Sequence, residues 1–141
     1  MDDKLDFHTL KGYELQENKE ITYAMEDYLE MICRLCETKE YVRINELANK
    51  LNVKSSSVSK MASQLKTSGL VSFEKYGLIE PTTKGIKLGN YLIYRHKILH
   101  DFLCLINNSD NELEQVEKIE HYFNIQTIQN IENLYNKIKN G

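Results

Sequence analysis

The sequence predicts a mainly α-helical fold in which a winged helix-turn-helix is followed by an all-helical segment. Two short amphipathic stretches with helical spacing are separated only by Asn52-Val53-Lys54, which is the skeleton of a helix-turn-helix. Directly after them the hydrophobic period changes from 3.6 to 2 and then back, as expected for a small β-hairpin between helices. One proline and six glycines in 141 residues also favour helix over a turn-rich fold.

The first predicted helix runs from Ile21 to about Lys39, after a polar stretch, residues 1–20, that we expect to be an N-terminal extension. Its apolar residues recur three or four positions apart and form one stripe. Cys33 and Cys36 form a C-x-x-C pair, which could suggest a zinc or redox site. Both lie on the apolar stripe and no second pair accompanies them, so we predict that they pack in the core.

The helix-turn-helix is predicted from two stretches that share one spacing. Apolar residues follow an i, i+3, i+4, i+7 pattern at Ile44, Leu47, Ala48 and Leu51, and again at Val58, Met61, Ala62 and Leu65. Gly69 is expected to end the second helix, because glycine readily adopts the left-handed conformation needed there.

A two-stranded wing is predicted next. It consists of a strand over Leu70–Glu74, a turn at Tyr76-Gly77 and a return strand over Leu78–Glu80. Thr82 or Thr83 can then cap the following helix.

The C-terminal part is predicted to be entirely helical. A long helix is apolar on more than one face, which indicates burial against a partner. The polar run Asn107–Asp110 ends it, and Asp110 can cap a further helix that runs to about Tyr122. A last helix is predicted over Ile125–Ile138, and a domain boundary is expected inside the long helix, near residues 85–92.

Charge is distributed unevenly along the chain. The net charge of −3 combines −6 over residues 1–37, +5 over residues 38–90 and −2 over residues 91–141. A basic centre between acidic flanks suits a module that binds a polyanion. No stretch approaches the ~20 apolar residues of a membrane span, no secretory signal is visible, and three cysteines are too few for a disulfide framework. We therefore expect a cytoplasmic protein.

The second helix of the helix-turn-helix opens with serines and lysines. In this motif, the N-terminal residues of the second helix face the major groove of DNA. Short hydroxyls allow a close approach, and lysines can meet phosphates or guanine edges. The alternative is a serine-rich helix start that caps itself and has no other role. The predicted DNA-contacting residues are Lys54, Ser55, Ser56, Ser57, Ser59 and Lys60, with Lys75 and Tyr76 at the wing tip.

Three groups of carboxylates and histidines have the spacing of ligands on a helix face. They are Asp27 with Glu30, His96 with His100, and the run Glu117, Glu120 and His121. Taken singly, each group is also explained as a solvated helix face. Together, from different helices, their oxygen and imidazole donors suit a divalent metal ion.

Four motifs carry a resemblance to a known family. They are Met25-Glu26-Asp27-Tyr28-Leu29-Glu30, Lys54-Ser55-Ser56-Ser57-Val58-Ser59-Lys60-Met61, Tyr94-Arg95-His96 and Val116-Glu117-Lys118-Ile119-Glu120-His121. In this order the chain resembles the diphtheria-toxin-repressor family of metal-dependent regulators, in its manganese transport regulator branch, over roughly residues 22–138.

The resemblance implies a two-metal site. Its ligands would be Asp27, Glu30, His96, Glu117, Glu120 and His121. Iron-responsive members have methionine where Asp27 stands and cysteine where Glu117 stands. Carboxylates at both positions favour Mn²⁺, two ions per subunit, with Fe²⁺ as the second choice. His100 replaces an acidic residue common in the family and is not counted as a ligand.

The expected function is that of a homodimeric, metal-activated repressor that binds double-stranded operator DNA and shuts off metal-uptake genes. Its expected domains are an extension (1–20), a winged-helix DNA-binding domain (21–88) and a helical dimerisation and metal-binding domain (89–141). No membrane, no small-molecule substrate and no enzymatic activity are expected, because the chain leaves little room for a substrate cleft. The alternatives are a metal-independent winged-helix regulator that responds to a small molecule, and an iron-responsive repressor of the same family.

Overall fold

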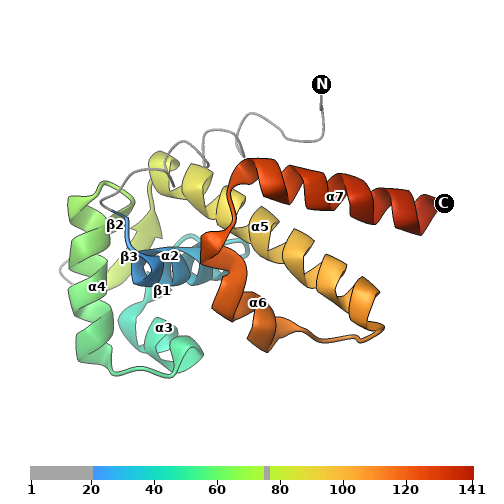
Figure 1. The fold of residues 1–141 in the computed structure, drawn as a ribbon. Helices are drawn as coiled ribbons and strands as arrows, with labels where there is room; N and C mark the ends of the chain where they lie inside the picture. The colour runs from blue at the N-terminus through green and yellow to red at the C-terminus, as the bar shows by residue number, and fades with distance from the viewer. Residues whose placement is uncertain (1–20, 75–76) are drawn as a thin grey trace. The chain divides into compact units, whose positions relative to one another are not determined.

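A computed structural model describes residues 21–74 and 77–141 (Figure 1). The predicted extension over residues 1–20 and the predicted DNA contacts Lys75 and Tyr76 lie outside the described residues. The described chain divides into two compact units, one ending at Leu92 and the other beginning at Ile93. Among the described residues, no helix combines the length and the apolar composition that crossing a membrane requires.

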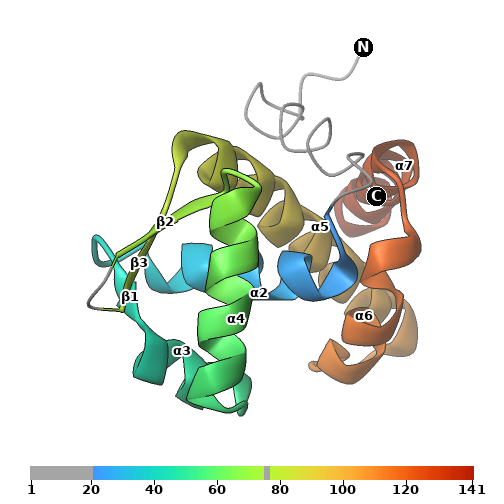
Figure 2. The ribbon, with the colours of Figure 1, turned by 90° about the vertical axis from the view of Figure 1, so that its left-hand side faces the viewer.

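The N-terminal unit is a helix-turn-helix packed against a third helix and a small sheet. It contains α2 (Tyr23–Leu35), α3 (Ile44–Leu51), α4 (Ser55–Thr67) and the first part of α5 (Thr83–Asn107). Helix α4 packs against α3 and α2, as Figure 2 shows. The predicted pair of short helices is confirmed, while α2 ends four residues before the predicted Lys39. The fully buried side chains of this unit include Leu29, Ile32, Val42, Leu47, Val58, Leu65, Leu70, Ile79, Leu88 and Leu92.

The wing is the expected hairpin with one strand added. Strands β2 (Val71–Phe73) and β3 (Leu78–Pro81) pair in antiparallel fashion, and β1 (Val42–Arg43) pairs with the other edge of β3. The sheet order is therefore β1-β3-β2. Strand β1 was not predicted, because two residues are too few to show an alternating period.

Gly69 and Thr82 connect the end of α4 to the start of α5. Gly69 follows α4 with a φ of +77°, which is the predicted left-handed stop. The hydroxyl oxygen of Thr82 accepts the Gly85 N–H at 3.0 Å and its O–H donates to the Gly69 carbonyl at 2.7 Å. Of the two candidate threonines, Thr82 therefore caps α5 and also ties its start to the end of α4.

Gly85→Ala should destabilise the N-terminal unit. A Cβ at this position would lie 1.9 Å from the Leu70 carbonyl oxygen, so the backbone would have to move. Overpacking of this kind costs about 1–3 kcal/mol. Urea denaturation followed by circular dichroism measures the loss, with Asn90→Ala, an exposed position on the same helix, as the control. Equal stability of the Gly85→Ala variant and the parent would show that α5 and the Leu70 backbone are not packed this closely.

The C-x-x-C pair takes part in packing. Cys33 is buried, and its thiol donates to the Gly85 carbonyl at 3.7 Å. Burial raises the pKa of the Cys33 thiol to about 12, so the metal-binding thiolate is strongly disfavoured. The core-packing prediction is confirmed for Cys33, whereas Cys36 is only half-buried.

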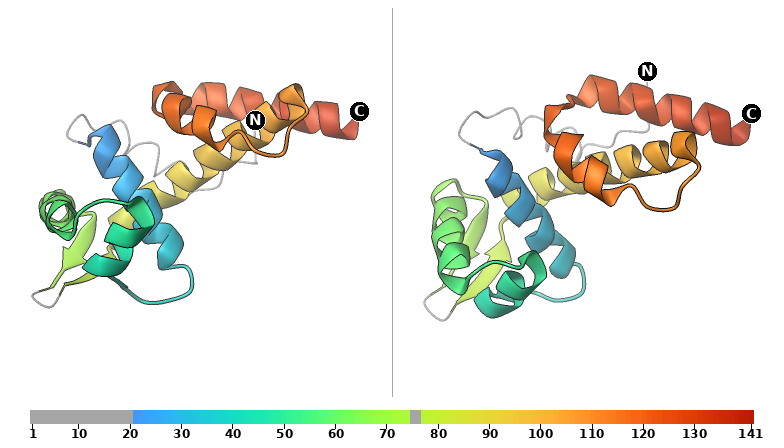
Figure 3. Two further views of the ribbon diagram at one scale, coloured as in Figure 1. Left: turned by 90° about the horizontal axis from the view of Figure 1, so that it is seen from below. Right: turned by 60° about the horizontal axis from the view of Figure 1, so that its bottom comes forward.

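The C-terminal unit contains the rest of α5, α6 (Leu113–Ile119), the 3₁₀ turn η1 (Glu120–Tyr122) and α7 (Ile125–Asn140). Helix α7 runs alongside the second half of α5 in both views of Figure 3, and the Tyr94 hydroxyl donates to Glu132 of α7 at 2.7 Å. The core of this unit consists of Ile98, Leu99, Val116 and Ile128, with Tyr94, Leu103, Phe123 and Ile131 packed around it.

The predicted helix, capped by Asp110 and running to about Tyr122, is placed too early at its start, while its predicted end agrees with the end of η1. Helix α6 begins at Leu113 with Glu112 as its N-cap, and its last turn tightens into η1. The Asn111 side chain accepts the Leu113 N–H at 2.9 Å, and Ser109 donates to the Glu112 side chain at 2.6 Å. These local bonds extend the loop beyond Asp110, because side chains of the loop itself satisfy its polar groups.

Candidate functional site

The start of α4 presents the predicted DNA-contacting residues to solvent. Lys54, Ser55, Ser56, Ser57 and Lys60 are exposed and Ser59 is half-buried, whereas Val58, Ala62 and Leu65 are buried on the opposite face. The N-cap residue is Lys54, and no side chain caps this helix. The alternative role of the serines, capping their own helix, is therefore not observed.

One neighbour of the predicted DNA-contacting residues was missed from the sequence. The Ser55 hydroxyl donates to the side-chain oxygen of Asn45, at the start of α3, at 2.9 Å. This bond joins the two helices of the motif at their exposed end. A single sequence carries no signal for it, because it depends on how α3 and α4 approach each other.

The acidic pair of the N-terminal unit lies on α2, where Asp27 is exposed and Glu30 is buried. They are three positions apart and therefore share one helix face. Arg34 holds the Glu30 carboxylate through its Nε at 3.1 Å and its Nη2 at 2.8 Å, both to Oε2. A charge-assisted pair of this kind fixes the orientation of the carboxylate.

The C-terminal unit brings two of its four predicted ligands into direct contact. His96 Nδ1 lies 3.1 Å from Oε1 of Glu120, which is buried on η1. Nδ1 of His121 lies 3.4 Å from Nη2 of Arg95, so the arginine donates to this ring. Glu117 is exposed on α6, one turn before Glu120. Two donor types, an imidazole nitrogen and a carboxylate oxygen, thus converge where His96 meets Glu120.

These donors fit a divalent cation. Carboxylate oxygens and imidazole nitrogens together suit hard-to-borderline metals such as Mn²⁺ and Fe²⁺. The His96–Glu120 contact supports this fit. The ring nitrogen and the carboxylate oxygen both point at the proton they share, and a metal ion can take the place of that proton.

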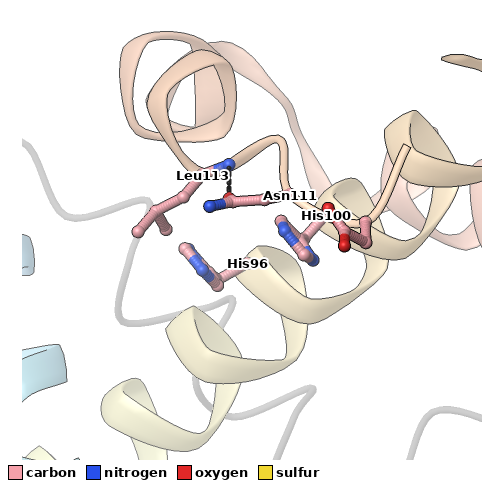
Figure 4. A pocket seen from close by; sticks show the side chains of 5 residues that line it. His96, His100, Asn111 and Leu113 are labelled. Carbon is pink, nitrogen blue, oxygen red and sulfur yellow. Dashed lines mark hydrogen bonds between the residues drawn. The ribbon is translucent and has the colours of Figure 1, made fainter.

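A pocket of about 520 Å³ lies beside His96 between α5 and the loop before α6 (Figure 4). It is lined by His96, His100, Asp110, Asn111 and Leu113. The rings of the two histidines are parallel, with centroids 6.3 Å apart. Nε2 of His100 accepts the backbone N–H of Glu112 at 3.1 Å, a contact that sequence reasoning did not find.

Two family models match the chain. Residues 20–78 match the model described as iron dependent repressor, N-terminal DNA binding domain, and residues 82–140 match iron dependent repressor, metal binding and dimerisation domain.

Curated relatives and solved structures agree with this match. The chain is 42% identical over 92 residues to the HTH-type transcriptional regulator MntR of Shouchella clausii. The aligned segment covers 65% of this chain and 64% of that relative. It is 44% identical over 91 residues to MntR of Geobacillus thermodenitrificans, with 64% of each covered. The structure of the manganese regulator SloR matches with a TM-score of 0.70 at 29% identity, over 79% of this chain and 53% of that one. The chain thus spans about two thirds of the curated relatives and half of the SloR chain.

Proposed function

Because the chain belongs to the iron-dependent repressor family, we propose that it is a homodimeric, metal-activated repressor that acts in the cytoplasm on double-stranded operator DNA. One chain holds both an exposed serine–lysine recognition helix and the His96–Glu120 pair, within the segment matched by the metal-binding model. This combination supports metal-controlled DNA binding most directly. The relatives are regulators and not enzymes, in agreement with the sequence-based prediction.

In this proposal α4 enters the major groove. Lys54 and Lys60 contact phosphates or guanine edges, and the serines between them allow the backbone to approach the bases. In a homodimer, two such helices about 34 Å apart reach successive major grooves on one face of the duplex. Dimerisation through the segment at residues 89–141 would set that separation.

The proposed ligands come from both units. Asp27 and Glu30 belong to the N-terminal unit, and the others are His96, Glu117, Glu120 and His121 of the C-terminal unit. A bound cation would supply the positive charge that holds these carboxylates together. The ligand-assembled arrangement then gains population because it binds the metal more tightly than other arrangements do.

Mn²⁺, with two ions per subunit, is the proposed metal, and Fe²⁺ is the second choice. The carboxylates at Asp27 and Glu117 offer hard oxygens, which Mn²⁺ accepts well. The names of MntR and of the manganese regulator SloR indicate manganese as the metal of those proteins. Genes for metal uptake are the proposed targets.

The test is DNA binding measured against Mn²⁺, Fe²⁺, Co²⁺ and Zn²⁺, with a chelated control. The duplex is selected from a randomised pool by the protein. We expect binding only with metal present, and the strongest activation with Mn²⁺. Affinity that a chelator leaves unchanged would instead favour a metal-independent regulator that responds to a small molecule, and activation by Fe²⁺ alone would favour the iron-responsive alternative.

Lys54→Ala and Lys60→Ala should each weaken DNA binding and leave metal affinity unchanged. Each lysine that neutralises a phosphate contributes about −0.9 to the slope of log K against log salt, so each variant should flatten that slope by about one. Anisotropy titrations at several salt concentrations measure the slope, with Lys118→Ala, an exposed lysine of α6, as the control. An unchanged slope in both variants would remove α4 from the phosphate contacts.

A further inference from the structure

We propose that His100 is a positioning residue of the metal site, which holds the ligand-bearing helix α6 against α5 and does not bind the metal itself. This role rests on the proposed function, because it concerns the same ligands. The sequence alone left His100 without a role, since it stands where the family commonly has an acidic residue.

The hydrogen bond to the loop determines which ring nitrogen of His100 acts as the acceptor. A backbone N–H can only donate, so Nε2 of His100, which accepts from Glu112 at 3.1 Å, carries no proton. In the neutral ring the proton then resides on Nδ1. The sulfur of Cys104, one turn later on α5, lies 3.9 Å from Nδ1 and 3.7 Å from Nε2, so it packs against the ring without favouring either nitrogen. The Glu112 N–H is thus the directed hydrogen-bond partner of this ring.

The bond ties α5 to the first residue of the ligand-bearing segment. Glu112 is the N-cap of α6 and has no side-chain capping bond of its own. From Glu112 the chain continues through α6 into η1, and so carries Glu117, Glu120 and His121. His96 lies one turn before His100 on α5. The His100–Glu112 bond therefore fixes where this segment starts relative to His96.

The contacts of the neighbouring loop indicate that His100 holds this loop and does not bind the metal. In Figure 4, His100 faces the loop that holds Asn111, whose side chain accepts the Leu113 N–H at 2.9 Å. A metal on Nε2 of His100 would displace the Glu112 N–H and leave the start of α6 without this partner. The rings of His96 and His100 are parallel with centroids 6.3 Å apart, so the clamp formed by the His100–Glu112 bond lies beside a proposed ligand.

Two substitutions separate these roles. His100→Gln keeps an acceptor near the position of Nε2, whereas His100→Leu keeps similar bulk without an acceptor. Mn²⁺ affinity and stoichiometry are measured from the electron paramagnetic resonance signal of free Mn²⁺. We expect His100→Leu to bind Mn²⁺ about tenfold more weakly with unchanged stoichiometry, at the lower end of what loss of a supporting contact costs. His100→Gln should stay close to the parent, as should the control Asp101→Asn.

Amide hydrogen exchange tests the clamp in the metal-free protein. The Glu112 amide should exchange slowly in the parent and in His100→Gln, and at least tenfold faster in His100→Leu. Fast exchange in the parent would show that the bond does not hold the loop. Equal Mn²⁺ affinity of His100→Leu and parent, or weakening by His100→Gln as large as by His100→Leu, would overturn the positioning role. Loss of one metal ion from both variants would make His100 a ligand. A parent that binds none of Mn²⁺, Fe²⁺, Co²⁺ and Zn²⁺ would refute the proposed function, and this role with it, whatever the exchange rates.

Discussion

Glu30→Gln should lower metal-activated DNA binding by about 100-fold, close to the upper end of typical allosteric coupling. The substitution keeps the size of the side chain and removes its charge, so the N-terminal unit loses a proposed metal ligand while its packing is retained. Arg34, which now makes two charge-assisted bonds to Glu30, would keep only a neutral acceptor. The metal would then no longer favour the DNA-binding arrangement as strongly.

The measurement is fluorescence anisotropy of the selected duplex at saturating Mn²⁺, with sedimentation to follow the dimer. The dimer should persist, because the proposed dimerisation segment lies in the other unit. Glu37→Gln removes the same charge from an exposed position just after α2 and should leave binding unchanged. Wild-type affinity in Glu30→Gln would show that metal activation does not pass through Glu30.

The helix-turn-helix was predictable because its signal is local. The repeated spacing in α3 and α4 reports which side chains enter the core, and Gly69 marks the end of α4 through its own conformational preference. Strand β1 was not predictable, since Val42 becomes part of a strand only by pairing with Ile79, far away in the sequence. Local patterns determine single helices, whereas this sheet edge depends on tertiary contact.

The same distinction applies to the candidate sites. The exposure of the Lys54–Lys60 segment followed from the apolar face behind it, which the sequence shows. The six-residue ligand set came from family resemblance, because spacing on one helix cannot show which helices meet. The start of α6 was misplaced because Asp110 and Asn111 are both common N-cap residues, whereas the observed N-cap, Glu112, makes no side-chain capping bond. Its backbone N–H is instead bound by His100, a contact that no local pattern shows.

Glu117→Cys should change the number of metal ions bound and the identity of the activating metal. A carboxylate offers two hard oxygens, and Glu117 would use them to help hold the second Mn²⁺ of the proposed site. Mn²⁺ is at the weak end of the divalent affinity order, so the site must select it by coordination number and ligand type. A single soft thiolate would replace both hard oxygens. We expect one Mn²⁺ per subunit to be lost, and activation to shift towards Fe²⁺, Co²⁺ or Zn²⁺.

Metal stoichiometry and metal-dependent DNA binding across the four metals measure this change, and Co²⁺ adds a spectroscopic test. A thiolate bound to Co²⁺ gives a charge-transfer band, which Glu117→Cys should show. Glu114→Cys is the matched control, because Glu114 is an exposed carboxylate one turn earlier on α6 and introduces the same thiol outside the proposed site. Since burial keeps the Cys33 thiol protonated, it should add no band of its own. An unchanged metal ranking with two ions still bound in Glu117→Cys, or equal bands in both variants, would exclude Glu117 from the metal site.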